Sequence, residues 1–348
     1  MNQRLVYIDL IRAYSIFLVT GYHLWRFFSS PKLEFFNYYN IYSIFIKGSW
    51  GVLLFFIISG FSMALITYDK VCNSKINWKE YLIKRLYRII PAYYVAILIW
   101  TILILNGVTS KPISFVDQIT HLLFIHTFFP STFYSISGVF WTLGIEMQFY
   151  FILPLILFFI IKRPIVSLII LGLPICYQIF INQNIPVNSA LIFCLFYFIL
   201  GYIIYIYKNK LYNIFFNNKY KNIILVFFLF IFLNLTFLKE DIINIELNKI
   251  LWTLIFIPIF IYLSKNEYIQ ESKNRFLSVI VFTGTSSYSI YLYNYIFYMD
   301  KKPFEYSFFA VIYYFFLIYV IGILMYFIVE GPFQVMRKKY LIKKRSNF

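Results

Sequence analysis

The sequence contains few charged residues, few cysteines and few histidines. Only 13% of the 348 residues are charged, whereas 61% are hydrophobic, and long apolar runs recur from one end to the other. This composition excludes an ordinary soluble globular domain and is typical of a polytopic membrane protein. The cysteines have neither metal-ligand spacing nor the pattern of a disulfide framework, so we expect no metal site and no disulfide scaffold. They are Cys72, Cys176 and Cys194.

Acidic residues are scarce as well. The 31 Lys and Arg residues outnumber the 14 Asp and Glu residues, which gives a net charge of +17. Such a charge could indicate nucleic-acid binding, but the basic residues form short clusters between apolar runs. Membrane topology explains this pattern better, so we expect no nucleic-acid partner. The first apolar run is a poor signal peptide, because Asp9 and Arg12 interrupt it and no small-residue cleavage site follows it.

Apolar runs of about 20 residues predict membrane-spanning helices. The sequence therefore predicts an all-α, polytopic integral membrane helical bundle of about ten transmembrane helices, built as one domain over residues 1–332. A short basic tail at 333–348 follows and is expected to anchor on anionic membrane lipids. The basic separator at 162–164 favours a tight hairpin over one broken helix. The expected spans are 7–28, 43–68, 86–106, 146–162, 164–181, 188–207, 222–238, 249–264, 279–298 and 307–329.

The distribution of Lys and Arg predicts the orientation of these spans, because short positive loops stay in the cytoplasm. With the N-terminus inside, 22 of the 31 Lys and Arg residues fall in cytoplasmic segments, eight fall outside and Arg12 lies within a span. We therefore expect both termini to be cytoplasmic and the protein to lie in the cell inner (plasma) membrane.

The helix expected at 7–28 carries three ionisable residues, Asp9, Arg12 and His23. An ionisable residue inside a span is costly and is a functional candidate by default. Arg12 and His23 are eleven positions apart, so they share one helix face and are separated by about 16 Å along the axis. Asp9 lies one turn before Arg12 and can pair with it. The alternative is an arginine that reaches the membrane surface and a histidine satisfied by a neighbouring helix.

Three more charged residues occur at predicted span ends. Glu146 begins the fourth span, where the positive end of a helix favours a carboxylate. Alternatively, Glu146 pairs with His23, which is expected at a similar depth in the membrane, and makes the imidazole a better base. Arg85 and Arg88 share one face at the cytoplasmic end of the third span. They either orient this span or clamp a phosphate group.

The segment at 107–145 contains an apolar stretch, FVDQITHLLFIHTFF, with His121 and His126. We expect an interfacial or re-entrant helix there. On one continuous helix, residues five positions apart differ by about 140° around the axis, so the two histidines are poorly placed to share a metal ion. We interpret them as structural.

Six motifs follow one another along the chain: YIDLIRAYSIFLVTGYH, GVLLFFIISGF, RLYRIIPAYY, FWTLGIEMQFYFILPL, SYSIYLYNY and EGPF. In this order they resemble the membrane acyltransferase-3 family, whose hallmark is an arginine, ten residues and a histidine. The resemblance extends from Asp9 to Pro332. One departure is Met147, because members of the family often have a second acidic residue directly after the position of Glu146.

The resemblance implies transfer of an acyl group, commonly acetyl, from acetyl-CoA or another acyl-CoA to a surface carbohydrate or lipid-linked glycan. By position, it implies that His23 is the general base and that Arg12 and Glu146 are essential to the catalytic site. It also implies that Arg85 and Arg88, together with Arg12, serve the acyl-CoA. Positions that support the site are Asp9, Ser59, Trp141 and Tyr150.

The ionisable residues of the first span also fit a different class of protein. In a transporter or flippase for a glycan or lipid-linked substrate, Asp9, Arg12 and His23 would form a proton or substrate pathway. Such a protein would work without acyl-CoA. The ordered series of motifs favours the O-acyltransferase.

Overall fold

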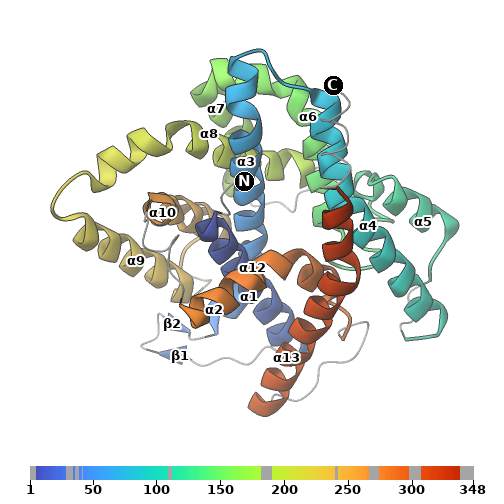
Figure 1. Ribbon diagram of the computed structural model, residues 1–348. Helices are drawn as coiled ribbons and strands as arrows, with labels where there is room; N and C mark the ends of the chain where they lie inside the picture. Colours follow the sequence, from blue (N-terminus) through green and yellow to red (C-terminus); the bar gives the residue numbers. More distant parts are fainter. Residues whose placement is uncertain are drawn as a thin grey trace. The chain divides into compact units, whose positions relative to one another are not determined.

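Helices form most of the structure, a computed structural model, as Figure 1 shows. It describes residues 5–28, 34–35, 39–40, 42–108, 112–181, 190–239, 242–265, 274–297 and 307–337. Two strands of two residues each, β1 (Glu34–Phe35) and β2 (Tyr39–Asn40), pair antiparallel. Of the basic tail expected at 333–348, residues 338–348 lie outside the described residues.

The helical elements follow one another with short connections. In chain order they are α1 (Val6–Phe27), α2 (Ser43–Ile46), the 3-10 helix η1 (Lys47–Trp50), α3 (Gly51–Cys72), α4 (Trp78–Leu105), α5 (Phe115–Leu122), the 3-10 helix η2 (His126–Phe128), α6 (Trp141–Lys162), α7 (Pro164–Ile181), α8 (Ala190–Phe216), α9 (Lys221–Phe237), α10 (Ile245–Lys265), α12 (Arg275–Tyr293), α13 (Phe308–Met325) and the π-helix η4 (Tyr326–Glu330).

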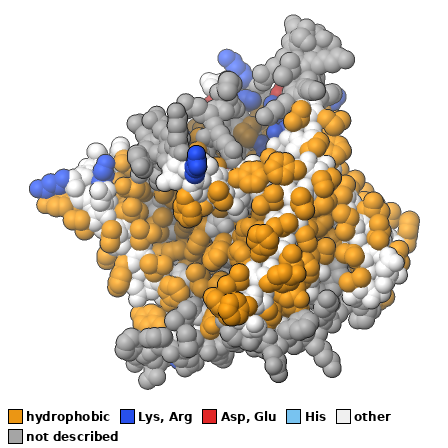
Figure 2. Space-filling model, turned by 60° about the horizontal axis from the view of Figure 1, so that its bottom comes forward, with side chains coloured by type: hydrophobic (Ala, Val, Ile, Leu, Met, Phe, Trp, Pro, Cys, Tyr) orange, Lys and Arg blue, Asp and Glu red, His pale blue; other side chains and the backbone are white. Residues whose placement is uncertain are grey.

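Each predicted span is helical over most of its length, so the all-α prediction is confirmed. Two of the spans, 43–68 and 307–329, each include more than one helical element. Seven helical segments in the described part of the chain are long and apolar enough to cross a membrane, and two shorter helices are also apolar. Hydrophobic side chains cover most of the face drawn in Figure 2, and Lys and Arg form small groups. These features indicate an integral membrane protein. The count of ten spans and the cytoplasmic position of the termini stay predictions.

Two helices begin earlier than their apolar runs suggest. Helix α4 starts at Trp78 rather than near 86, and the Asn77 side chain caps it by accepting a hydrogen bond from the Glu80 N–H at 3.0 Å. Helix α6 starts at Trp141 rather than at Glu146. Capping and the first polar turn extend a helix beyond its apolar part, which is the part that hydropathy detects.

The chain folds into two compact units. The first unit comprises Met1–Ser74, Phe159–Ile185 and Ile192–Thr285, and the second unit comprises Lys75–Phe158, Pro186–Leu191 and Ser286–Phe348. Helices α6 and α12 each contribute to both units. The predicted single domain over 1–332 stays a prediction.

Glycines bring helices close together in the first unit. Helix α1 packs along α3, and both are blue in Figure 1. At the crossing of α3 and α8, a Cβ atom on Gly60 would lie 1.8 Å from the Phe198 carbonyl oxygen. Conversely, a Cβ atom on Gly201 would lie 2.0 Å from the Ile57 carbonyl oxygen. These distances show that the backbones of α3 and α8 approach closely where both helices carry a glycine.

We expect Gly60→Ala to destabilise the protein by about 3 kcal/mol or more, because the obstructing atom is backbone and the helices must separate. Thermal unfolding of the purified protein measures the effect. Gly172→Ala is the matched control, since its Cβ would lie 3.7 Å from the Phe196 ring, an ordinary contact. Equal unfolding temperatures for the two variants would contradict the close crossing.

Candidate functional site

The first group of candidate residues lies on α1 in the first unit. The helix is continuous from Val6 to Phe27, so Arg12 and His23 share a face, as the spacing predicts. The predicted pair is also present: Arg12 Nη1 lies 3.1 Å from Asp9 Oδ1. Asp9 is buried, and a Cβ atom on Gly284 would lie 1.8 Å from its carbonyl oxygen. The arginine therefore has a fixed partner that offsets the cost of holding the charge in an apolar helix.

His23 lies one turn before the end of α1 and is partly exposed. Its ring centroid is 5.2 Å from that of Tyr22, whose hydroxyl accepts a hydrogen bond from Arg26 Nη1 at 3.1 Å. Arg26 is three positions from His23, which places the guanidinium on the same side of the helix. Ser59, on α3, is half-buried. The imidazole is thus accessible at the end of the helix opposite the ion pair.

The second group lies in the second unit and is connected through Tyr150. The Arg85 guanidinium carbon lies 5.7 Å from the centre of the Tyr150 ring. The Tyr150 hydroxyl donates a 2.5 Å hydrogen bond to Glu146 Oε1, one turn earlier on α6. Arg85 also interacts electrostatically with Glu146 and Arg88. The tyrosine therefore connects a candidate cation to a candidate carboxylate.

Arg85 is the most buried charged residue of this group. Its side chain is buried, and within the described residues its Nε atom has no hydrogen-bond partner. A buried polar atom without a partner is costly, and Arg85 therefore has a hydrogen-bond donor that the described residues leave unused. An anion with oxygen atoms fits this position.

Helix boundaries change the interpretation of three candidates. Because α4 begins at Trp78, Arg85 and Arg88 lie in its second and third turns rather than at its start. Glu146 is five positions after Trp141, beyond the first turn, where the stabilisation of a carboxylate by the helix end has fallen off. The interpretation of Glu146 as an N-terminal helix charge is therefore wrong. Trp141 itself stacks on Phe133, with ring centroids 5.7 Å apart.

The candidate residues thus form two sets, one in each compact unit. Asp9, Arg12, His23 and Ser59 belong to the first, and Arg85, Arg88, Trp141, Glu146 and Tyr150 belong to the second. Each set has the internal contacts described above. The pairing of His23 with Glu146 would join the two units and stays a prediction.

The structure corrects the geometry expected for His121 and His126. Helix α5 ends at Leu122 and Phe124 has a positive φ of 58°, so the two residues do not share one helix. Instead, their fully buried rings stack with centroids 3.9 Å apart and planes 9° apart. His121 Nδ1 donates to the Asp117 carbonyl at 2.8 Å, and His126 Nε2 donates to the Phe140 carbonyl at 3.2 Å. In the described part of the chain, no three His, Cys, Asp or Glu residues gather as a metal site.

Burial lowers the pKa of the stacked imidazoles. The pKa of His121 falls to about 4, and the pKa of His126 falls to about 3 because burial and the neighbouring ring of His121 both oppose its charge. Both folded-state values lie below the ordinary value of 6.5. The unfolded chain therefore binds protons first as the pH falls, and the pair stabilises the fold only when neutral.

We expect the unfolding temperature of the wild-type protein to fall as the pH drops from about 6.5 towards 4. The double variant His121→Asn with His126→Gln keeps an amide N–H at each donating position but cannot titrate. It should lose less stability between pH 7.5 and pH 5 than the wild type. Thermal unfolding at both pH values checks this, and parallel losses in the two proteins would show that the pair does not control acid stability.

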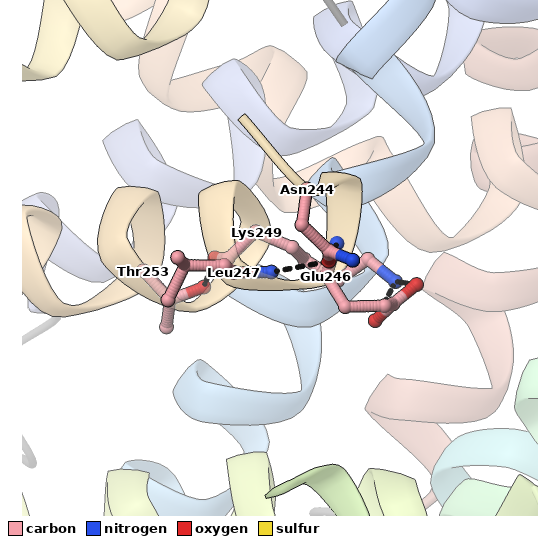
Figure 3. Close-up of polar contacts among 5 residues, drawn as sticks. All are labelled: Asn244, Glu246, Leu247, Lys249 and Thr253. Carbon is pink, nitrogen blue, oxygen red and sulfur yellow. Dashed lines mark hydrogen bonds and ion pairs between the residues drawn. The ribbon is translucent and has the colours of Figure 1, made fainter. Parts of the chain in front are cut away.

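Sequence reasoning missed an ion pair near the start of α10 in the first unit, drawn in Figure 3. Lys249 Nζ lies 2.6 and 2.7 Å from the two Glu246 carboxylate oxygens. Asn244 Oδ1 accepts hydrogen bonds from the N–H groups of Glu246 and Leu247, at 3.0 and 3.2 Å. The three-residue spacing of opposite charges was the available signal. The pair explains how Lys249 enters an apolar helix. In the topology prediction, Lys249 is one of the eight Lys and Arg residues counted outside.

Comparison with known proteins identifies the family of this chain. A model of the acyltransferase-3 family, described as an acyltransferase domain, matches residues 5–331. The chain is also similar to the "Putative peptidoglycan O-acetyltransferase YrhL" of Bacillus subtilis (strain 168), with 29% identity over 163 residues, which is 43% of this chain and 23% of that relative. No solved structure gives a significant match. The family match includes the candidate residues of both units, and the chain therefore belongs to the acyltransferase-3 family of integral membrane acyltransferases.

Proposed function

We propose that this protein is a membrane O-acyltransferase that moves an acyl group, most simply acetyl, from acyl-CoA to a hydroxyl of an extracytoplasmic carbohydrate. The family match over residues 5–331 carries the proposal. Support comes from the charged residues that the apolar helices hold in fixed contacts. In this proposal the protein lies in the plasma membrane with both termini in the cytoplasm, as the excess of Lys and Arg on that side favours.

The donor is assigned to the second unit. Arg85 is buried, its Nε atom lacks a hydrogen-bond partner within the described residues, and Arg88 is close enough to interact with it electrostatically. Arginine presents a planar set of donors that matches phosphate oxygens, so the phosphate groups of acyl-CoA suit this position. On the proposed topology these arginines lie towards the cytoplasm, where acyl-CoA occurs.

The acid–base chemistry is assigned to His23. The imidazole removes the proton of an acceptor hydroxyl while the hydroxyl oxygen attacks the thioester carbonyl. The carbon–sulfur bond then breaks, and the CoA thiolate leaves and takes up a proton. Arg12, held by Asp9, lies about 16 Å along α1 from His23, a distance that a pantetheine arm can bridge. Glu146 is assigned to stabilise the charged imidazole, because Tyr150 already orients its carboxylate.

The acceptor is assigned as a surface polysaccharide or a lipid-linked glycan. The name of the Bacillus subtilis relative specifies peptidoglycan, which is one member of this class. Mass spectrometry of envelope glycans from cells with and without the gene tests the assignment. We expect an O-acyl ester that disappears with the gene and returns with the wild-type chain. Identical glycan profiles together with no transfer from labelled acetyl-CoA by the purified protein would contradict the proposed function.

A further inference from the structure

The final helix carries a polar stripe on an otherwise apolar segment. Glu330, Gln334 and Arg337 follow one another at intervals of four and three residues, so they share one face. Glu330 is 3% exposed and accepts hydrogen bonds from Ser289 Oγ at 2.6 Å and from Gln334 Nε2 at 2.9 Å. Burying a carboxylate in an apolar helix is costly, and these two hydrogen bonds offset part of that cost.

The stripe begins beside the helix that carries the donor arginines. The π-helix η4, which ends at Glu330, packs against α4. About two turns further on, Arg337 interacts electrostatically with Arg85, Arg88 and Glu330. The last helix therefore adds a third guanidinium to the charges that act on Arg85.

Three arginines and two carboxylates interact electrostatically in this cluster. The arginines are Arg85, Arg88 and Arg337, and the carboxylates are Glu146 and Glu330. The buried Nε atom of Arg85 has no hydrogen-bond partner within the described residues. A bound anion would supply the missing acceptor for this atom.

We propose that Arg337 is the third arginine of a phosphate-binding site with Arg85 and Arg88, and that its ligand is the phosphorylated adenosine end of acyl-CoA. The inference rests on the proposed function, since it deepens the assignment of the donor. CoA carries a diphosphate bridge and a ribose phosphate, so several arginines can each contact a different phosphate group. Arg337 thus connects the C-terminal helix to donor recognition.

The test is the affinity of the purified full-length protein for CoA and for pantetheine, which lacks the phosphates, measured by isothermal titration calorimetry. Arg337→Gln should weaken CoA binding about tenfold or more, as expected for the loss of a charge-assisted hydrogen bond, and should leave pantetheine binding unchanged. Lys79→Gln is the matched control, because it removes one positive charge from an exposed position on α4. It should change the CoA affinity less than twofold.

The outcomes separate the two proposals. Wild-type protein that does not bind CoA contradicts the assigned donor itself. Wild-type protein that binds CoA, with Arg337→Gln no weaker than Lys79→Gln, overturns the role of Arg337 and leaves the donor assignment standing. If Arg337→Gln does not fold, Arg337→Lys replaces it, because it keeps the charge but loses the planar fork. Weaker CoA binding by that variant supports the inference, and unchanged binding overturns it.

Discussion

Replacing His23 with alanine is expected to lower acyl transfer by about 10²- to 10⁴-fold, the usual contribution of a general base. His23 is partly exposed near the end of α1, so its loss should affect the chemistry far more than the packing. The assay measures transfer from labelled acetyl-CoA to purified acceptor glycan, normalised to folded protein. The fall should appear in kcat, because the donor phosphates are assigned to residues of the second unit.

A second histidine provides the matched control for this variant. His121→Asn removes an imidazole that is fully buried and has no proposed part in the transfer, so the specific activity of this variant should equal that of the wild type. Glu146→Gln should reduce activity in the same direction as His23→Ala. The double variant should be little worse than His23→Ala alone, because groups that act as one unit lose most of their effect at the first deletion. Wild-type turnover in His23→Ala would exclude the imidazole as the base and favour a transporter.

The double variant Arg85→Lys with Arg88→Lys is expected to raise the KM for acyl-CoA by about 100-fold. Lysine keeps both positive charges, so membrane orientation is preserved, but it loses the fork of donors that matches phosphate. A charge-assisted hydrogen bond contributes about 1.5–3 kcal/mol, and two weakened contacts are enough for this change. The lysine at 85 also loses the flat contact of the guanidinium with the Tyr150 ring.

Arg163→Lys tests whether any exchange of arginine for lysine has this effect. Arg163 is exposed between α6 and α7, outside both candidate sets. Its KM for acyl-CoA should match that of the wild type, and the protein yields of all three proteins should be similar. An unchanged KM in the double variant would leave Arg85 and Arg88 with a role in membrane orientation only.

The apolar helices of this fold could be predicted from the sequence because hydropathy detects them directly. The apolar runs coincide with helices, and the spacing of Asp9, Arg12 and His23 on α1 needs only the geometry of a helix. The Asp9–Arg12 ion pair follows from the same geometry. A local rule suffices wherever both partners lie within one helix.

Features that depend on a break in the helix or on distant partners could not be predicted. The stacked rings of His121 and His126 require the end of α5 and the positive φ at Phe124, which no apolar pattern records. Lys47 lies near the start of the span predicted at 43–68 and is only 3% exposed. Its Nζ atom donates to the carbonyl oxygens of Leu235 at 2.7 Å and Leu238 at 2.6 Å. These partners are almost 200 residues away in the sequence.

The π-helix at Tyr326–Glu330 determines where the C-terminal helix can gain or lose one residue. Pro332 follows it and has no N–H, and the Gly331 N–H bonds to the Tyr326 carbonyl across the widened turn. Such a turn accommodates one inserted residue without altering the helix faces on either side. A one-residue deletion inside it should restore a regular helix and leave Arg337 on its face. The same deletion earlier in α13 would rotate everything after it by about 100°, away from α4.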